Sequence, residues 1–145
     1  LGASPVVIDD QTDNPFRDSL TKRSVVIRGD ARTEGTLARA NIAEADTLLV
    51  LTGNDAVNLS VALAAKQINP KIKTVIRVFD HAFAGKVEKG FGVTDAISVA
   101  DIAAPHFAGA ALFSNAVASY KFQDRLLVLQ DLPGTAIGLV ALPLK

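Results

Sequence analysis

The sequence predicts an α/β domain in which an open, mostly parallel β-sheet carries helices on both faces. Short apolar runs recur along the chain, and their starts lie roughly 19 to 27 residues apart, which leaves room for a helix in each interval. The runs are continuous rather than alternating, as is typical of strands covered on both faces in a parallel sheet. The expected order of elements is therefore βαβα.

Five runs are the predicted strands of this sheet. Each is rich in β-branched or aliphatic residues, which favour extended structure, and each leads into polar or glycine residues. The runs are Pro5–Ile8, Ser24–Ile27, Thr47–Leu51, Thr74–Val78 and Asp95–Val99.

The first two intervals with clear helix signals follow the second and third strands. Thr33 is a predicted N-cap for a helix over Glu34–Ala40. Asn54 and Asp55 cap a longer helix, which Asn69 and Pro70 end. The apolar stripe of this longer helix is Val57, Val61, Leu63, Ala64 and Ile68.

Two further helices are predicted after the fourth and fifth strands. A short helix over His81–Lys89 is expected to end at Gly90, a residue type common just beyond helix ends. Asp101 is the predicted cap of a helix from Ile102 to about Ala118, with Pro105 in its first turn, where the missing N–H costs little.

Composition limits the possible classes of protein. The chain has 145 residues, of which 49% are hydrophobic and 21% charged, and a net charge of zero, which indicates a folded domain with a sizeable core. No apolar run reaches the ~18 to 20 residues of a membrane span, and no signal peptide opens the sequence. The absence of cysteine excludes disulfides and thiolate chemistry, and scattered Lys and Arg argue against a nucleic-acid partner. Because the sequence contains no Met, we expect it to be part of a longer polypeptide.

The end of the chain has a different character from the rest. Tyr120–Phe122 and Leu126–Leu129 are strand-like, and Pro133 and Gly134 indicate a turn. We therefore divide the chain into a domain over residues 1–118 and a linker or the start of a following module over residues 119–145.

Polar residues at the strand ends predict a ligand site. The carboxyl ends of parallel strands lie at one edge of the sheet, where helix N-termini and loop amides converge. Asp9 and Asp10 are candidate acceptors for ribose hydroxyls, and Asp30 is a candidate polar wall for adenine or ribose. Gly29 allows a close approach of the backbone, and Arg77 could meet a phosphate or an internal Asp. Each residue taken alone is better explained by a turn or a helix cap, and only the set as a whole indicates a ligand site.

Catalysis has little support in this sequence. His81 and His106 are the only histidines, and neither has a recognisable neighbouring acid and nucleophile. No zinc-protease, P-loop, nucleophile-elbow or calcium-loop pattern is present. The sequence therefore predicts no catalytic residues, no metal site and no enzyme.

Three stretches together resemble a known family. They are VVID, then VVIRGDARTEGTLARANIAEADTLLVLTGNDAVNLSVALAAKQINPKIKTVIRVFD, then FGVTDAISVADIAAPHF, and they span about residues 5 to 115. They resemble the nucleotide-binding lobe of the regulator of potassium conductance domains and of the Trk/Ktr peripheral potassium-uptake subunits.

The resemblance implies a Rossmann-like domain that senses NAD(H), ATP or ADP without chemistry and gates a potassium channel or transporter. It implies that Asp9 or Asp10 contacts ribose and that Asp30 and Ala31 border the adenine. The path of the sugar and phosphate would be lined by Thr52, Gly53 and Asn54. The resemblance assigns a binding role to Arg77 less strongly than to these three residues. It also implies a homodimer or higher homo-oligomer, a membrane-embedded partner subunit and a cytoplasmic location at the inner face of the membrane.

One departure from the family pattern is the lack of a first strand with its G-x-G-x-x-G turn before Val6. Without that turn a pyrophosphate lacks its main cradle of backbone amides, so we expect dinucleotide binding by these residues to be weak or absent. The sheet is then incomplete at its N-terminal side, unless another subunit or the Leu126–Leu129 strand fills the gap. Two alternatives stay open: a fragment of an NAD(P)-dependent oxidoreductase or epimerase, and a dimerisation scaffold with a decayed site.

Overall fold

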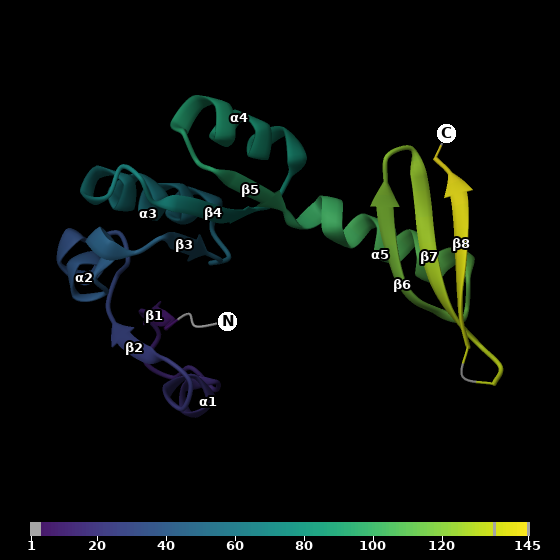
Figure 1. Cartoon of the computed structure of the whole chain (residues 1–145), viewed down its shortest axis with the longest axis horizontal. Coiled ribbons are helices and arrows are strands. Elements are labelled where there is room, and N and C mark those ends of the chain that lie inside the picture. Colours follow the sequence, from purple (N-terminus) through teal and green to yellow (C-terminus); the bar gives the residue numbers. More distant parts are fainter. Residues whose placement is uncertain (1–3, 135, 145) are drawn as a thin grey trace. The chain divides into compact units, whose positions relative to one another are not determined.

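The computed structural model describes residues 4–134 and 136–144 and divides the chain into two compact units (Figure 1). Unit 1 extends to Val78 and includes Phe83–Ile97, and unit 2 consists of Phe79–Ala82 and the chain from Ser98. Each unit is described by itself. Among the described residues, no helix is both long enough and apolar enough to cross a bilayer.

Unit 1 is an α/β unit, as the sequence predicts. Its N-terminal elements are β1 (Val6–Asp9), α1 (Arg17–Thr21), β2 (Val25–Arg28), α2 (Glu34–Arg39) and the 3-10 helix η1 (Ile42–Glu44). The elements that follow are β3 (Thr47–Val50), α3 (Asp55–Ile68), β4 (Lys73–Val78), α4 (His81–Phe91) and β5 (Asp95–Ser98). α4 begins in unit 2 and continues into unit 1.

The strands of unit 1 form two sheets. β1 pairs with β2 in parallel, with Val6 opposite Val25. β3 pairs with β4 in parallel, with Thr47 opposite Lys73, and the order of the second sheet is β3-β4-β5. The βα alternation and parallel pairing confirm the predicted fold class, and the carboxyl ends of paired strands lie together as expected.

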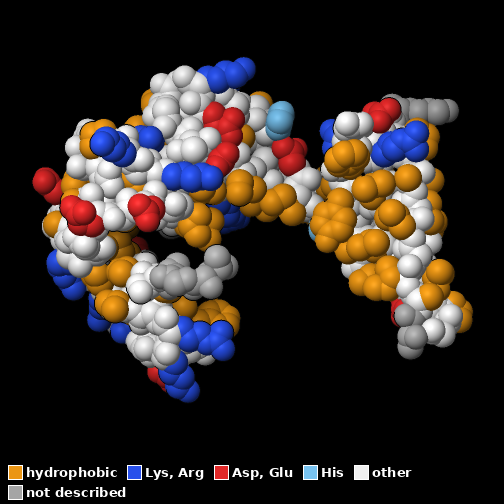
Figure 2. Space-filling view, viewed as in Figure 1, with side chains coloured by type: hydrophobic (Ala, Val, Ile, Leu, Met, Phe, Trp, Pro, Cys, Tyr) orange, Lys and Arg blue, Asp and Glu red, His pale blue; other side chains and the backbone are white. Residues whose placement is uncertain are grey.

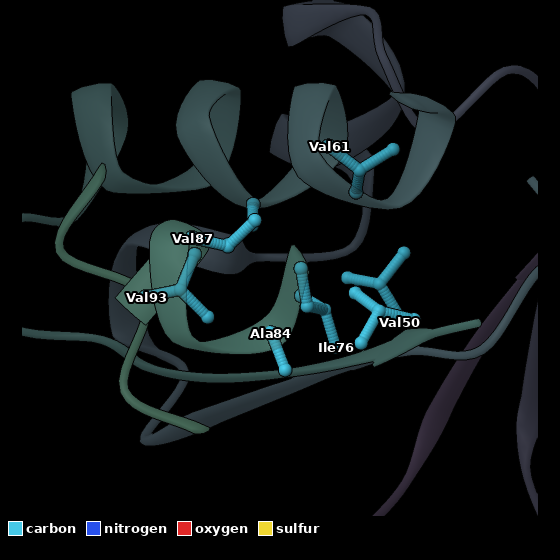
Figure 3. Close-up of a cluster of buried hydrophobic side chains, with 8 residues drawn as sticks. Val50, Val61, Ile76, Ala84, Val87 and Val93 are labelled. Carbon is cyan, nitrogen blue, oxygen red and sulfur yellow. The ribbon is translucent and has the colours of Figure 1, made fainter. Parts of the chain in front are cut away.

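The core of the second sheet is built from small and β-branched side chains. Val61 of α3, Ala84 and Val87 of α4, and Val50 and Ile76 of the strands converge in one buried cluster (Figure 3). Continuous apolar strands require such cover, because their side chains point to both faces. This packing fixes where β3 and β4 end, and those ends form part of the predicted site.

Unit 2 combines the helix α5 with an antiparallel sheet. α5 (Val99–Leu112) is followed by β6 (Ala116–Phe122), β7 (Arg125–Leu132) and β8 (Ala136–Pro143), in the order β6-β7-β8. The predicted strand-like segments and the turn at Gly134, which has a φ of +88°, are present, and β8 was not predicted. The domain division at residue 118 stays a prediction, although contacts group α5 with the strands that follow it.

The structure removes one way of completing the sheet of unit 1. Leu126–Leu129 lies within β7, which is hydrogen-bonded to β6 on one side and to β8 on the other. Both edges of this strand are therefore already occupied. The suggestion that it fills a gap in the parallel sheet is wrong.

The bounds of two helices differ from those expected. α4 continues through Gly90 to Phe91, and Gly92, with a φ of +65°, is the residue in left-handed conformation. α5 begins at Val99, because the side chain of Ser98 rather than that of Asp101 caps it. Pro105 consequently lies inside the helix instead of in its first turn.

Candidate functional site

The carboxyl ends of β3 and β4 are joined by one buried side chain, Asn58 of α3. Its Oδ1 accepts hydrogen bonds from the backbone N–H and the hydroxyl of Thr52, at 3.0 and 2.6 Å. Its Nδ2 donates to the carbonyl oxygens of Thr52 and Arg77, at 3.0 and 2.8 Å. Asn58 has no exposed surface, and these four bonds satisfy its carboxamide and hold the strand ends in place.

Arg77 reaches across from β4 to the same loop. Its Nη1 donates to the carbonyl oxygen of Thr52 at 2.9 Å and lies 3.9 Å from the position that a Cβ on Gly53 would occupy. The guanidinium thus bonds to a backbone carbonyl, and the predicted meeting of Arg77 with a phosphate or an internal Asp stays a prediction. A guanidinium has five N–H donors, so one such bond leaves others for a ligand oxygen.

The first turn of α3 follows directly from this loop. Asn54 is the N-cap, as predicted, and its Oδ1 accepts from the backbone N–H of Val57 at 3.1 Å. The hydroxyl of Thr52 accepts from the Asn54 N–H at 3.3 Å. Thr52, Gly53 and Asn54 therefore form one braced loop, with exposed backbone at Gly53.

The loop after β2 depends on a glycine. Gly29 has a φ of +158°, and a Cβ there would lie 2.7 Å from the hydroxyl oxygen of Thr36 in α2. Its N–H donates to the carbonyl oxygen of Asp9 at 3.2 Å, which ties the end of β2 to the end of β1. The space that a Cβ would fill therefore faces α2, and the close approach of a ligand at Gly29 stays a prediction.

Asp30 is engaged within its own turn. Its two carboxylate oxygens accept from the guanidinium of Arg32 at 2.7 to 3.0 Å, and Oδ1 also accepts from the Arg32 N–H. Hydrogen bonds from Arg32 lower the pKa of Asp30. The pKa of Arg32 is raised mainly by Asp30 and further by the charge of Asp10.

Asp9 also has local partners. The side-chain amide of Asn14 donates to its Oδ2 at 2.8 Å, and the backbone N–H of Gln11 donates to its Oδ1 at 3.1 Å. These bonds, in that order of importance, lower the pKa of Asp9. A carboxylate held in this way stays ionised and can still accept from a ligand hydroxyl, because it has about four lone-pair sites.

Packing brings the loop after β2 to the α3 side of the unit. Ala31 lies against the buried cluster that contains Val50 and Val61, and Val57 of the first α3 turn packs on the same cluster. Within the described chain, no hydrogen bond or ion pair links Asp9, Asp10 or Asp30 to the Thr52–Asn54 loop. The predicted residues thus form two groups, connected through apolar packing at Ala31.

Sequence reasoning did not identify Asn58 as a residue of the site. The signal was present, because an Asn lies on the helical face that also carries Val61, Ala62 and Ala65, all of them buried. A polar residue in an apolar stripe must find partners when buried. Its partners are Thr52, in the loop after β3, and Arg77, near the end of β4, and the sequence had selected both.

The remaining candidate features lie elsewhere. A shallow concavity of about 560 Å³ is lined by Phe16, Ser19, Leu20, Lys22 and Arg23, none of which belongs to the predicted site. The described residues contain no group of His, Asp or Glu side chains arranged to hold a metal ion. In unit 2 the exposed His81 side chain, at the start of α4, lies with its Nδ1 2.8 Å from the Asp101 carboxylate.

The fold and these strand-end loops define a Rossmann-like α/β domain. A family model described as "TrkA-N domain" matches residues 2–99, which is more than half of the chain. The chain therefore belongs to the TrkA-N domain family.

Individual relatives agree with this assignment. A Trk system potassium uptake protein TrkA homolog from Pyrococcus abyssi is 45% identical over 56 residues, covering 39% of this chain and 25% of the relative. The chain thus spans about a quarter of the length of that relative.

Solved structures share the fold. The TrkA-N domain of inner membrane protein ybaL from Escherichia coli superposes with a TM-score of 0.58 at 20% identity, covering 74% of this chain and 75% of the other. The Kef CTD of Shewanella denitrificans, in an AMP-bound form, gives 0.65 at 22% identity, covering 77% and 66%.

Proposed function

We propose that this chain is a non-catalytic regulatory domain that responds to an adenine nucleotide and controls a potassium channel or transporter. The TrkA-N family match, the potassium-uptake name of the Pyrococcus relative and the AMP-bound state of the Kef neighbour support this proposal. The supporting feature within the chain is the braced corner of Thr52, Asn58 and Arg77, beside the exposed backbone of Gly53.

The corner suits the polar part of a nucleotide. The guanidinium of Arg77 supplies positive charge and spare donors, and the N-terminal turn of the 14-residue helix α3 adds a favourable potential for an anion. Asp9 and Asp10 would accept from ribose hydroxyls, and Gly29, Asp30 and Ala31 would border the base. With the nucleotide bound in this way, Arg77 faces the phosphate. The path from sugar to phosphate is then lined by Thr52, Gly53 and Asn54.

A monophosphate is a better probe of this site than a dinucleotide. The 145 residues contain no G-x-G-x-x-G loop, so a pyrophosphate has no amide cradle from these residues. We therefore expect NAD(H), ATP and ADP to bind no more tightly than AMP, with dissociation constants of roughly 0.1–1 mM, which corresponds to about 4–5.5 kcal/mol.

The test is a calorimetric titration of the chain with AMP, adenosine and NAD⁺. We expect AMP to bind about tenfold more tightly than adenosine, because only AMP offers a phosphate to Arg77. Arg77→Gln should remove that preference, whereas the matched control Glu44→Gln, in η1 before the start of β3, should keep it. Equal affinity for AMP and adenosine would contradict the assignment of Arg77, and failure of AMP to bind at 10 mM would contradict nucleotide sensing.

Control of a potassium system needs a separate test. Because the chain covers only part of its relatives, we propose a membrane-embedded potassium channel or transporter as its partner, with the domain at the cytoplasmic face of the membrane. Potassium-uptake measurements on the parent polypeptide, with and without Asn58→Ala, would test this link. We expect loss of nucleotide-dependent uptake and no turnover of nucleotide.

A further inference from the structure

The last strand of the unit 2 sheet, β8, has one unpaired edge. β8 ends the order β6-β7-β8 and pairs with β7 over eight residues without a shift of register (Figure 1). A strand at the end of a sheet presents a row of backbone N–H and C=O groups that its neighbour does not use. Because β8 is long and regular, this row is long as well.

Two backbone bonds identify the groups of β8 that point outward. The N–H of Leu144 donates to the carbonyl oxygen of Asp124 at 2.6 Å, and the N–H of Asp131 donates to the carbonyl oxygen of Asn115, before β6, at 2.9 Å. Hydrogen-bonded pairs alternate with non-hydrogen-bonded pairs along an antiparallel ladder. Counted back from Leu144, every second residue of β8 therefore bonds to β7, and the residues between them direct both backbone groups away from it. These outward groups, the free edge of β8, belong to Ile137, Leu139 and Ala141.

Other terminal strands of the protein have side-chain partners for such groups. The N–H of Ser119 in β6 donates to Nδ1 of His106 in α5 at 3.1 Å, and the pairing of β6 with β7 contains a register shift. The N–H of Ala96 in β5 donates to the carboxylate of Glu88 in α4 at 2.8 Å. Bonds and irregularities of this kind block the pairing of an edge. Within the described part of the chain, no hydrogen bond uses the free edge of β8.

The sequence of β8 also lacks the residues that protect an edge strand. Lysine, inward charges and proline are the usual protection, but residues 136–142 contain none of them, and Pro143 only ends the strand. Ile137 and Leu139 are 67% and 63% exposed on one face, and the residues that alternate with them are half-buried on the other. Figure 2 shows hydrophobic side chains gathered over the region of β6–β8. A strand added at this edge would therefore meet apolar side chains on both of its faces.

Two charged residues of β7 lie beside this edge. Arg125 is opposite Pro143 and Asp131 is opposite Ile137, so the two charges are near the two ends of β8, about 20 Å apart at ~3.3 Å per residue. None of the ion pairs found among the described residues includes either side chain. A strand added beyond β8 lies about 10 Å from β7, which two long side chains of opposite charge can span. Because β8 has no charged residue, a second copy of β8 offers neither charge a partner.

We propose that the free edge of β8 binds an extended segment of a different protein, which becomes the fourth strand of the unit 2 sheet. The segment runs antiparallel to β8, as the other strand pairs of this sheet do, and is rich in apolar and β-branched residues. It carries an acidic residue near Pro143 and a basic residue near Ile137. Its alternate residues exchange about six backbone hydrogen bonds with the free edge. In such strand addition, the main chain supplies affinity and the side chains supply specificity.

A synthetic heptapeptide with blocked ends is the probe for this proposal. Valine and threonine alternate in it, beginning with valine, between an N-terminal glutamate and a C-terminal lysine. Hydrogen exchange of the full chain, followed by nuclear magnetic resonance with up to about 5 mM peptide, measures binding, for which we expect a dissociation constant of roughly 0.1–1 mM. Exchange at the amides of Ile137, Leu139 and Ala141 should slow about fivefold. The amides of Gly138 and Val140 should not change, because β7 already binds them.

The backbone of the peptide provides a matched control. N-methylation of the two threonines removes N–H groups that face β8 in the proposed register, and should weaken binding at least tenfold. N-methylation of the first two valines alters N–H groups that face away, and should leave binding within about threefold. Interchanging the glutamate and the lysine should weaken binding about threefold, because each charge then faces a like charge.

A variant of the chain tests the same contact from the other side. Leu139→Pro removes the central N–H of the free edge, at a position where an edge strand tolerates proline, and should weaken peptide binding at least tenfold. Leu139→Val keeps this N–H and should bind within about twofold of the original chain. Circular dichroism should show the same fold for both variants, and the methylated peptides decide the matter if Leu139→Pro does not fold.

Four outcomes would overturn the proposal. They are unchanged exchange of the three amides at about 5 mM peptide, equal binding of the two methylated peptides, equal binding after the charges are interchanged, and slower exchange of these amides with rising concentration of the chain alone. The last outcome would mean that a second copy of the chain occupies the edge.

Discussion

The two units use buried polar residues in different ways. In unit 1, Asn58 is fully buried and makes four hydrogen bonds that hold the ends of β3 and β4. In unit 2, Ser119 is equally inaccessible, but it lies where Gly109 lets α5 approach the sheet. The comparison shows that Asn58 of unit 1 braces the candidate site, whereas Ser119 of unit 2 lies where small residues allow close helix–sheet packing.

Removal of the Asn58 carboxamide should produce the largest difference in stability between the two units. Asn58→Ala removes the acceptor of the Thr52 N–H and a donor to the Arg77 carbonyl, so we expect a loss of about 2–4 kcal/mol in the stability of unit 1. Hydrogen exchange at the β3 and β4 amides measures this loss separately from unit 2. Ser60→Ala on the exposed side of the same helix is the control, and an equal effect of both changes would contradict the role of Asn58.

Replacing a glycine by alanine should have the next largest effect on stability, with opposite signs at Gly109 and Gly85. A Cβ on Gly109 would lie 2.7 Å from the Cβ of Ser119, whereas one on Gly85 of α4 would meet nothing within 4 Å. Gly109→Ala should therefore destabilise unit 2 by about 1–3 kcal/mol, and Gly85→Ala should stabilise its helix by roughly 0.5–1 kcal/mol. Exchange rates of the α4 and α5 amides measure both. Adding Ser119→Gly to Gly109→Ala should recover stability, and no recovery would show that the close approach is unimportant.

Removing a helix cap should destabilise the protein less, and by a similar amount in the two units. Asn54 caps α3 in unit 1, and Ser98 caps α5 in unit 2 while also donating to the carbonyl oxygen of Phe79 at 3.2 Å. We expect Asn54→Ala and Ser98→Ala each to cost about 1 kcal/mol, with Ser98 the larger because of its second bond. Hydrogen exchange of the backbone amides in the first turn of each helix measures this loss of stability. Asn54→Ser retains a capping oxygen and should restore most of the loss, and a full loss there would contradict capping.

The smallest expected effect is the pH dependence from Asp9. Its folded pKa is lowered, mainly by the Asn14 amide, so its contribution to stability is present above the unfolded value, about 3.9, and is lost as pH falls through the folded value. Because Asp9 is near the surface, the contribution should be at most about 0.5 kcal/mol. The stability difference between the chain and Asp9→Asn should shrink below about pH 4, as urea denaturation from pH 3 to 7 would show. A stability difference that stays constant from pH 3 to 7 would contradict the contribution of the Asp9 carboxylate.

Local signals predicted α2 and α3 of unit 1, whereas α1 and η1 were not predicted. Thr33 and Asn54 act as caps in the structure as expected, because a side-chain oxygen before an apolar repeat is a short-range feature. The loops after the strands were also found from sequence, because turn residues punctuate continuous apolar runs. What short-range signals could not give is which partners these residues choose, such as Arg32 for Asp30 or Thr52 for Arg77.

The misses arise where distant residues decide. Ser98 and Asp101 are both acceptable caps, and the bond of Ser98 to Phe79 belongs to a contact between segments 19 residues apart. β8 combines Gly and Pro with aliphatic residues, and its pairing with β7 over eight residues is what makes it a strand. The burial of Asn58 became interpretable only once both loops were in place.

The central claim is that the loops after the strands of unit 1 form one nucleotide site. The most direct measurement is the set of intermolecular nuclear Overhauser effects between AMP and the ¹³C-labelled chain. The account predicts contacts from adenine protons to the Ala31 methyl group and from ribose protons to the Thr52 methyl group in the same complex. Saturating AMP with contacts only to unit 2, or to one of these two methyl groups without the other, would contradict it.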